Sequence, residues 1–387
     1  MRWHQLGALY PFSRNHNDIH ATDQESYNWP QTVLPAARQA LNIRYSLLPY
    51  FYTKFELAHR TGQPVWQPLF FEHPEDTLSW KIDRQFLLGD GIMVSPALYA
   101  GQIQVKAYFP GQGRWFDLWT HECLIEHERH HLGRPRRFSE DGDGDRMHRY
   151  RFLSAKAERD PIPMSLAGGH VIPIQTPRLT VAETRLQPVS LIIALDQDGH
   201  AKGVMFVDDG ESTGKEVAWA KVSWEVTNGI SLVNRVETTP GAGQLRHGER
   251  IDKVTILGLN FDRIGGEQEN LSNEDLERLR ARLPTWRDNE HVGKYSAATS
   301  AGRSQRLFNL DQLSMSSACQ PYERAKRKRV VRSLSVNGIE VPVSLDPPLK
   351  DPLAGLSWEV NETLGSMTLT GLNMELLRPW FVRWTVE

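Results

Sequence analysis

A polar cluster follows a short apolar run near the start of the chain. Leu9, Tyr10 and Phe12 predict a short buried strand, and Arg14 and His16 come directly after it. An imidazole can donate to hydroxyl groups or accept from them, and a guanidinium is a multiple donor. In a (β/α)8 barrel the active site lies where the strands end, so a polar cluster directly after a strand favours ligand contacts. The alternative is that His16 only satisfies its own loop, or that the cluster is ordinary solvated surface.

Helices on both sides of this cluster are expected to position it. Residues 2–8 read as the end of one helix, and residues 33–60 show one long helical pattern. The apolar residues expected on its repeating face are Leu34, Leu41, Leu48, Tyr52 and Phe55. Pro49 should kink the helix because it lacks a backbone donor, and Gly62 should end it. Its aromatic residues Tyr45, Tyr50, Phe51 and Tyr52 are expected in the core.

Short strands dominate the rest of the chain. The predicted strands are 86–88, 92–94, 104–109, 115–118, 166–174 (with a turn at Gly168-Gly169), 189–196, 203–207, 254–259, 330–336 (followed by a turn at Asn337-Gly338), 366–369 and 381–386. The acidic stretch 208–212 (DDGES) predicts a turn between two strands, with Gly210 at positive φ. This pattern of strands is typical of β-sandwiches.

Composition sets the broad limits. The chain has 387 residues, so two or three domains are expected, and 40% of the residues are hydrophobic. The formal net charge of −2 does not indicate a nucleic-acid partner. No apolar run is long enough for a membrane span. Residues 262–328 are polar and predict a flexible insertion with a helix at 273–283. The basic run 324–329 is open to interpretation as a nuclear signal, a nucleic-acid patch or a protease-accessible site, and a solvated loop edge is the favoured interpretation.

Several long motifs, in one order, resemble glycoside hydrolase family 31. They are RWHQLGALYPFSRNHN at 2–17, NIRYSLLPYFYTKFELAHRTGQPVWQPLFFEHPED at 42–76, IDRQFLLGDGIMVSPAL at 82–98, IPMSLAGGHVIPIQTPRLT at 162–180 and GVMFVDDGEST at 203–213. Within the family they are similar to the acid α-glucosidase, sucrase-isomaltase and maltase-glucoamylase group. The resemblance implies a mainly β chain, the end of a (β/α)8 barrel followed by two β-sandwich domains. The implied domains are 1–75 (last barrel strand and helix), 76–165 (proximal sandwich) and 166–387 (distal sandwich, interrupted at 262–328).

The resemblance also implies roles for the polar cluster. His16 would contact the glucose ring of an α-glucoside oligosaccharide, and Arg14 would brace the same loop. The family cleaves with retention through two carboxylates about 5 Å apart, and it needs no metal or cofactor. In the family both carboxylates precede the motif that opens this chain. Asp18 and Asp23 follow the strand tip and match neither catalytic motif.

We therefore interpret the chain as the C-terminal part of a retaining α-glucosidase, inactive alone because it has neither carboxylate. The other interpretation is a non-catalytic, carbohydrate-binding or structural β-sandwich protein. A severed barrel end would leave an apolar patch from Leu9, Phe12, Leu41 and Leu48 with nothing to bury it. The sandwiches would then fold better without residues 1–75. A truncated gene model or a fragment is the simplest explanation.

Other motifs are weaker. His121, His127, His130 and His131 lie close in sequence, but no ligand spacing indicates a metal, and the stretch 140–145 (EDGDGD) lacks the twelfth-position Glu of a calcium loop. Cys123 and Cys319 could pair only if the fold brings them together. Asn270 and Asn361 stand in glycosylation sequons, which permit a secretory, lysosomal or extracellular location.

Overall fold

The computed structural model describes residues 1–30, 33–126, 149–156, 160–214, 217–245, 247–248, 250–259, 331–336, 339–341, 357–361 and 366–386. The chain divides into two compact units, Met1–Gly265 with Arg329–Glu387, and Gly266–Lys328. All described residues belong to the first unit. The predicted insertion and its helix, the basic run, the histidines at 127, 130 and 131, the stretch 140–145, the turn at 337–338, Asn270 and Cys319 lie outside the described residues.

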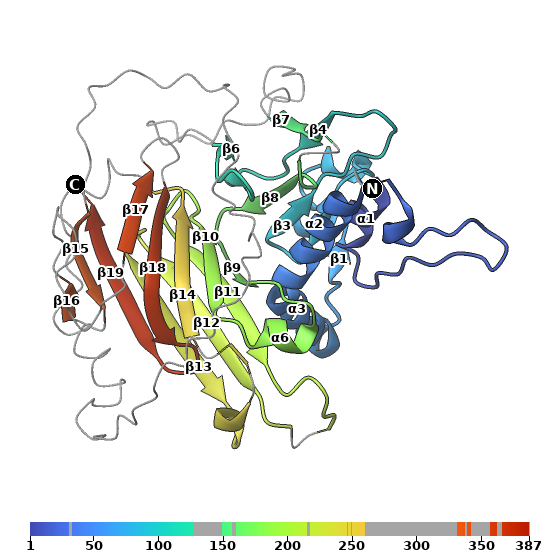
Figure 1. The fold of residues 1–387 in the computed structure, drawn as a ribbon. Coiled ribbons are helices and arrows are strands. Elements are labelled where there is room, and N and C mark those ends of the chain that lie inside the picture. The colour runs from blue at the N-terminus through green and yellow to red at the C-terminus, as the bar shows by residue number, and fades with distance from the viewer. Residues whose placement is uncertain are drawn as a thin grey trace. The chain divides into compact units, whose positions relative to one another are not determined.

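Three helices form the N-terminal part (Figure 1). They are α1 (Arg2–Gly7), α2 (Val33–Ser46) and α3 (Leu48–Thr61), with a short 3-10 turn η1 (Ser26–Asn28) before α2. The predicted kink at Pro49 is confirmed, because α2 and α3 are separate helices that meet at Leu47 and Pro49 lies in the first turn of α3. Gly62 ends α3 in the left-handed conformation, at φ 79°, as predicted.

The predicted apolar face of these helices is wrong. Leu41, Tyr52 and Phe55 are 47%, 41% and 42% exposed. The buried residues of α2 and α3, with their junction, are Ala36, Ala37, Ala40, Ile43, Leu47, Pro49, Tyr50, Phe51 and Thr53. Alanine fills the packed face of α2 because small side chains allow the helix to lie close to its neighbours. Tyr50 and Phe51 are in the core as expected, whereas Tyr45 is half-buried and Tyr52 is exposed.

The predicted strand at Leu9, Tyr10 and Phe12 is also wrong. Residues 8–12 form turns that continue from α1, with the Leu9 amide bonded to the Leu6 carbonyl and the Tyr10 amide to the Gly7 carbonyl. A strand needs a neighbouring strand to take its backbone hydrogen bonds, and here the preceding helix takes them. Leu9 is fully buried, whereas Phe12 is 76% exposed.

The first group of strands follows the helices. A six-stranded sheet has the order β1-β2-β3-β8-β5-β6, and β4 pairs with β7 separately. Their bounds are β1 Trp66–Gln67, β2 Phe86–Leu88, β3 Ile92–Val94, β4 Gln104–Tyr108, β5 Trp115–Asp117, β6 Cys123–Ile125, β7 Tyr150–Ser154 and β8 Met164–Ala167. Two short helical turns, α4 (Leu69–Glu72) and η2 (Ser79–Lys81), lie between β1 and β2 in the sequence.

The second group forms an eleven-stranded sheet within the described residues. Its order is β16-β15-β19-β13-β12-β11-β9-β10-β14-β18-β17. The bounds are β9 His170–Gln175, β10 Val189–Ala194, β11 Ala201–Val207, β12 Ala220–Thr227, β13 Ser231–Thr238, β14 Arg250–Leu257, β15 Val331–Val336, β16 Ile339–Val341, β17 Ser357–Asn361, β18 Ser366–Glu375 and β19 Trp380–Val386, with the helix α6 (Val181–Arg185) and the 3-10 turn η3 (Ala242–Gln244) between strands. Most pairs are antiparallel, whereas β10–β14 and β11–β9 are parallel. The mainly β prediction is confirmed.

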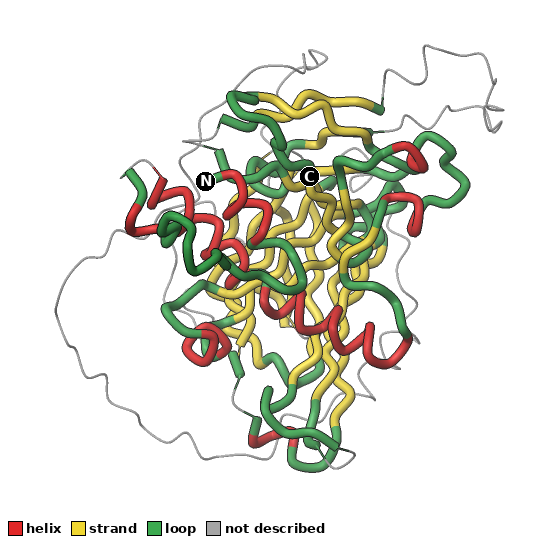
Figure 2. Tube along the Cα trace, turned by 90° about the vertical axis from the view of Figure 1, so that its right-hand side faces the viewer, coloured by secondary structure: helices red, strands yellow, loops and turns green. Residues whose placement is uncertain are grey.

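One hydrophobic core joins the helices to both sheets. It contains Leu6, Leu9, Ile43, Leu47, Tyr50, Phe51 and Val65 from the N-terminal part, together with residues of β2, β3, β5, β8, β9, β10 and β14. Figure 1 shows helices α1–α3 on one side of the strands, and in Figure 2, turned by 90°, helices lie in front of the strands. Helix α3 packs against β9 and β11. The expectation that nothing buries the barrel end is therefore wrong for Leu9. The predicted domain boundaries at 75 and 165 stay predictions, and this core crosses both.

The described residues also bear on the expectations about membrane spans and cysteines. No helix in the described part of the chain is long and apolar enough to cross a membrane. The Cys123 thiol donates to the Ile125 carbonyl at 3.4 Å, and whether it pairs with Cys319 stays open because Cys319 lies outside the described residues.

Candidate functional site

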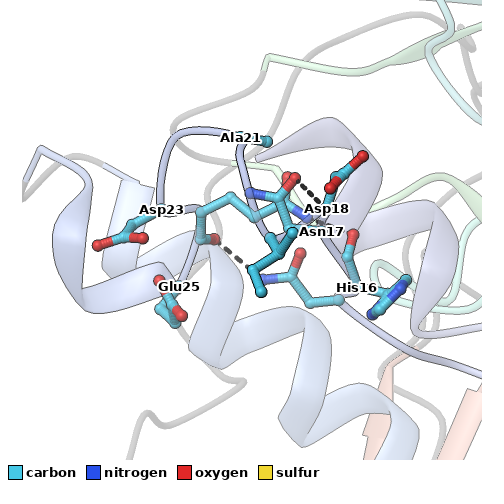
Figure 3. A pocket seen from close by; sticks show the side chains of 9 residues that line it. His16, Asn17, Asp18, Ala21, Asp23 and Glu25 are labelled. Carbon is cyan, nitrogen blue, oxygen red and sulfur yellow. Dashed lines mark hydrogen bonds between the residues drawn. The ribbon is translucent and has the colours of Figure 1, made fainter.

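Arg14 and His16 lie on an exposed loop, residues 13–25, between the turns after α1 and η1. Part of this loop borders an open hollow of about 340 Å³. Its lining residues are Asn15, His16, Asn17, Asp18, Ile19, Ala21, Asp23, Gln24 and Glu25. Figure 3 shows Asp23 and Glu25 on one side of this hollow and the imidazole of His16 on the other. The structure thus places His16 at the hollow. Arg14 lies two residues before His16 in the sequence and is not one of the residues that line the hollow.

Hydrogen bonds across the loop hold its two halves together. The Asn15 side-chain amide donates to the Gln24 carbonyl at 3.0 Å, and the Gln24 amide donates to the His16 carbonyl at 2.5 Å. Further along, Asn17 Nδ2 donates to the Thr22 carbonyl at 2.5 Å. These bonds use the side-chain amides of Asn15, Asn17 and Gln24 and the backbone carbonyls of His16, Thr22 and Gln24. Among the described residues, neither the His16 imidazole nor the Arg14 guanidinium has a hydrogen-bond partner, so both can contact a ligand.

The carboxylates of the hollow do not form a metal centre. No group of three His, Cys, Asp or Glu side chains in the described ranges is arranged to hold a metal ion. Asp18 Oδ1 instead accepts from the His20 backbone amide at 3.3 Å, a local turn contact. The chemistry available at the hollow is therefore hydrogen bonding to a polar ligand.

Arg44 of α2 fixes the turn that leads into the loop, and the sequence interpretation missed it. Its Nη1 donates to the Ala8 carbonyl at 2.8 Å and to the Tyr10 carbonyl at 2.6 Å, and its Nη2 donates to the Pro11 carbonyl at 3.1 Å. Burial lowers the pKa of the Arg44 guanidinium, which nevertheless stays charged. The acceptors of Arg44 are backbone carbonyls, so no sequence signal distinguishes it from Arg38, the other charged residue of α2.

The far end of the loop is tied to α1. His4 Nε2 lies 2.9 Å from the hydroxyl of Ser26 in η1. Burial lowers the pKa of His4, and the nearby amino terminus lowers it further, so the neutral ring can accept from Ser26. Helix α1 itself is anchored by Arg2, which donates to the Gln102 carbonyl at 2.8 Å and also binds the Ala155 carbonyl. Both ends of the loop are thus attached to packed elements.

The acidic stretch 208–212 forms the turn between β11 and β12 that the sequence predicted, with Gly210 at φ 76°. The Tyr52 hydroxyl donates to either carboxylate oxygen of Asp208, each at 2.8 Å, and Arg185 donates to the Asp209 carbonyl at 3.0 Å. Hydrogen bonds to the Asp209 carboxylate, of which the one from the Ser212 side chain has the largest effect, lower the pKa of Asp209 to about 2. These contacts give the turn a structural role that joins α3 and α6 to the sheet.

Two family models match the chain. Residues 1–54 match the glycosyl hydrolases family 31 TIM-barrel domain, and residues 62–172 match the glycosyl hydrolase family 31 C-terminal domain. The matches are consecutive, and the first covers α1, the loop, α2 and the start of α3.

Curated relatives give the same result. The lysosomal alpha-glucosidase of Rattus norvegicus is 39% identical over 263 residues, which cover 67% of this chain and 26% of that protein. The alpha-glucosidase of Hordeum vulgare is 41% identical over 262 residues, which cover 66% of this chain and 27% of that protein. The alpha-glucosidase of Mucor javanicus is 43% identical over 211 residues, which cover 54% and 22%. The chain thus spans about a quarter of the length of these relatives.

Solved structures share the fold. The glucosidase II alpha subunit matches with a TM-score of 0.65 at 19% identity, over 99% of this chain and 32% of that chain. The GH31 dextranase of Flavobacterium johnsoniae, complexed with glucose, matches with a TM-score of 0.61 at 17% identity, over 99% and 36%. At these identities the likeness concerns the fold alone.

Proposed function

The chain belongs to glycoside hydrolase family 31, with the end of its barrel domain and its C-terminal domain, and on that premise we propose that it is the C-terminal part of a retaining α-glucosidase. The proposed reaction removes terminal α-linked glucose from oligosaccharides. The observation that carries this proposal is the roughly 40% identity to relatives named alpha-glucosidase from animal, plant and fungus.

The proposed contribution of this chain is substrate binding through the loop 13–25. His16 and Arg14 are exposed, and in the described part of the chain neither the imidazole nor the guanidinium is hydrogen-bonded to another residue. An imidazole and a guanidinium at this place can donate to the hydroxyl groups of a glucose ring. A donor held in advance of binding stabilises the transition state most, because no energy is spent on ordering it during the reaction.

We propose that the chain does not carry the catalytic pair. A retaining glycosidase needs a nucleophile and an acid/base, two carboxylates about 5 Å apart across the scissile bond. The structure supports the proposal because Asp208 and Asp209 are engaged in the turn with Tyr52 and Ser212, and Asp18 caps a local turn. The proposed reaction uses carboxylates alone and so requires neither metal nor cofactor.

The proposed location is the secretory pathway, lysosomal or extracellular. It is supported by relatives from Rattus norvegicus and Mus musculus that are named lysosomal alpha-glucosidase. Asn361 stays a glycosylation candidate. Its backbone ends β17 and pairs with Ser366.

A chimeric enzyme tests the proposal. In the alpha-glucosidase of Hordeum vulgare, the segment that aligns with this chain is replaced by the chain's own residues, and hydrolysis of maltose and 4-nitrophenyl α-glucoside is measured. We expect activity within about tenfold of the parent, with α-glucose released first in the proton NMR spectrum. The isolated 387-residue chain should show no turnover. A folded but inactive chimera, first release of β-glucose, or turnover by the isolated chain would contradict the proposal.

A further inference from the structure

The turn after α1 directs three backbone carbonyls at one side chain. The carbonyl oxygens of Ala8, Tyr10 and Pro11 all accept from the guanidinium of Arg44, at 2.6–3.1 Å. These residues form no regular secondary structure that could take the same bonds. The conformation of the turn is therefore set by a residue 33 to 36 positions further along the chain.

Arg44 is itself held rigidly. It stands in the last turn of α2, whose buried alanines pack into the fold, and its guanidinium lies 5.1 Å from the centre of the Phe51 ring. Phe51 is only 2% exposed and belongs to the core that joins the helices to both sheets. The planar fork of arginine donates in several fixed directions at once, which the single ammonium of lysine cannot do.

We propose that Arg44 is a positioning residue for substrate binding: it holds the start of the loop 13–25 so that Arg14 and His16 face the sugar. The inference rests on the proposed function of those two residues. Pro11, the last residue that Arg44 holds, comes three residues before Arg14 and five before His16. A shift of the turn is transmitted directly along so short a segment, and a misplacement of about 1 Å costs roughly 100-fold in rate.

The bond between His4 and Ser26 holds the other end of the loop, and because it does not involve Arg44 it is expected to stay intact when Arg44 is changed. Loss of Arg44 should therefore release the first half of the loop, with Arg14 and His16, rather than unfold the whole loop. The hydrogen bonds from Gln24 to His16 and from Asn15 to Gln24 are expected to weaken with it.

The test compares Arg44→Met, which keeps the length but has no donors, with Arg44→Lys and with Arg38→Met, an exposed position on the same helix. In the 387-residue chain, the readouts are the NMR signals of the His16 ring and the rate of tryptic cleavage after Arg14. Arg44→Met should broaden or split the His16 signals and raise cleavage after Arg14 about fivefold or more. Arg44→Lys should show smaller changes than Arg44→Met in both the His16 signals and the cleavage rate after Arg14, and Arg38→Met should change neither.

Cleavage after Arg84, whose side chain is 62% exposed, reports general loosening. Equal increases after Arg14 and Arg84 in Arg44→Met, or unchanged His16 signals, would overturn the inference. The same variants in the chimera separate this inference from the proposed function. If Arg44→Met loosens the loop but His16→Ala leaves kcat/KM unchanged, the proposed function fails. If His16→Ala is damaging but Arg44→Met leaves loop and activity unchanged, only the positioning role fails.

Discussion

Removal of residues 1–75 is expected to destabilise the chain. The N-terminal helices and the sheets share one core, in which Phe86, Leu88, Ile92 and Ile172 of the sheets are at most 7% exposed. Polar contacts cross the same boundary, such as the hydrogen bond from the Tyr50 hydroxyl to the Leu88 carbonyl at 2.9 Å. The deletion removes the N-terminal partners of these apolar and polar contacts and exposes the four sheet residues to water.

The magnitude follows from those four side chains. Moving one such side chain from burial to water costs about 1.5–3 kcal/mol, so uncovering four costs roughly 6–12 kcal/mol. The free energy of unfolding of a typical protein is only about 5–15 kcal/mol. The shortened chain, residues 76–387, should therefore be unfolded or aggregated at room temperature. This reverses the expectation from sequence that it would behave better without its barrel end.

Size-exclusion chromatography with light scattering and thermal melts by circular dichroism measure the effect on both chains. A matched pair of substitutions on α3 gives the control within the full chain. Phe51→Ala removes a ring that is 2% exposed and should cost about 3–5 kcal/mol, whereas Phe55→Ala removes one that is 42% exposed and should cost less than about 1 kcal/mol. A monomeric 76–387 chain with an unchanged or higher Tm, or equal effects of the two substitutions, would refute the reasoning.

Three further predictions concern single residues. His121→Gly should stabilise the chain by about 1 kcal/mol, seen as a higher Tm than either wild type or His121→Ala, because His121 has φ 64° and only glycine adopts that conformation without cost. Asp76→Ala should destabilise the chain by about 3–5 kcal/mol in denaturant unfolding, because it removes the carboxylate that binds the Arg149 guanidinium, 12% exposed, at 2.8 Å; a loss below about 1 kcal/mol would count against this. Burial and the hydrogen bond to Asp208 raise the pKa of Tyr52 to about 12, so the phenol's contribution to stability is complete below about pH 10 and is lost as the pH rises through 12. NMR titration of the Tyr52 ring checks this, and Asp208→Asn should lower that pKa, whereas an unchanged value would exclude the carboxylate as a cause.

Local signals in the sequence were enough for much of the fold. Pro49 and Gly62 punctuate the helices as predicted, and most strands with alternating or apolar runs were placed within a few residues. Strands β1, β6, β7, β12, β13 and β17 were missed. In β12 the alternation is regular, as in Val222, Trp224 and Val226, which are all buried. The alternating pattern that indicates a strand is therefore present in the sequence at β12, although no strand was predicted there.

Other features depend on partners far along the chain. The run at Leu9–Phe12 is apolar, but whether it becomes a strand depends on a neighbouring strand, which periodicity cannot supply. The packed face of α2 consists of alanines, so the larger residue Leu41 indicated the wrong face. Arg44 could not be identified because its acceptors are backbone carbonyls, which leave no trace in the residue types. The candidate site residues themselves stay predictions from the resemblance.

The central claim is that His16 contacts the glucose ring, and its loss from an active enzyme tests that claim most directly. In the chimera described above, kcat/KM for maltose is measured for His16→Ala and for His20→Ala, an exposed histidine of the same loop that does not line the hollow. His16→Ala should lower kcat/KM by roughly 30- to 900-fold, equivalent to about 2–4 kcal/mol, with little change in Tm. His20→Ala should stay within about threefold of the unsubstituted chimera. A His16→Ala enzyme that also stays within about threefold would contradict the account, because His16 would then be an ordinary loop residue.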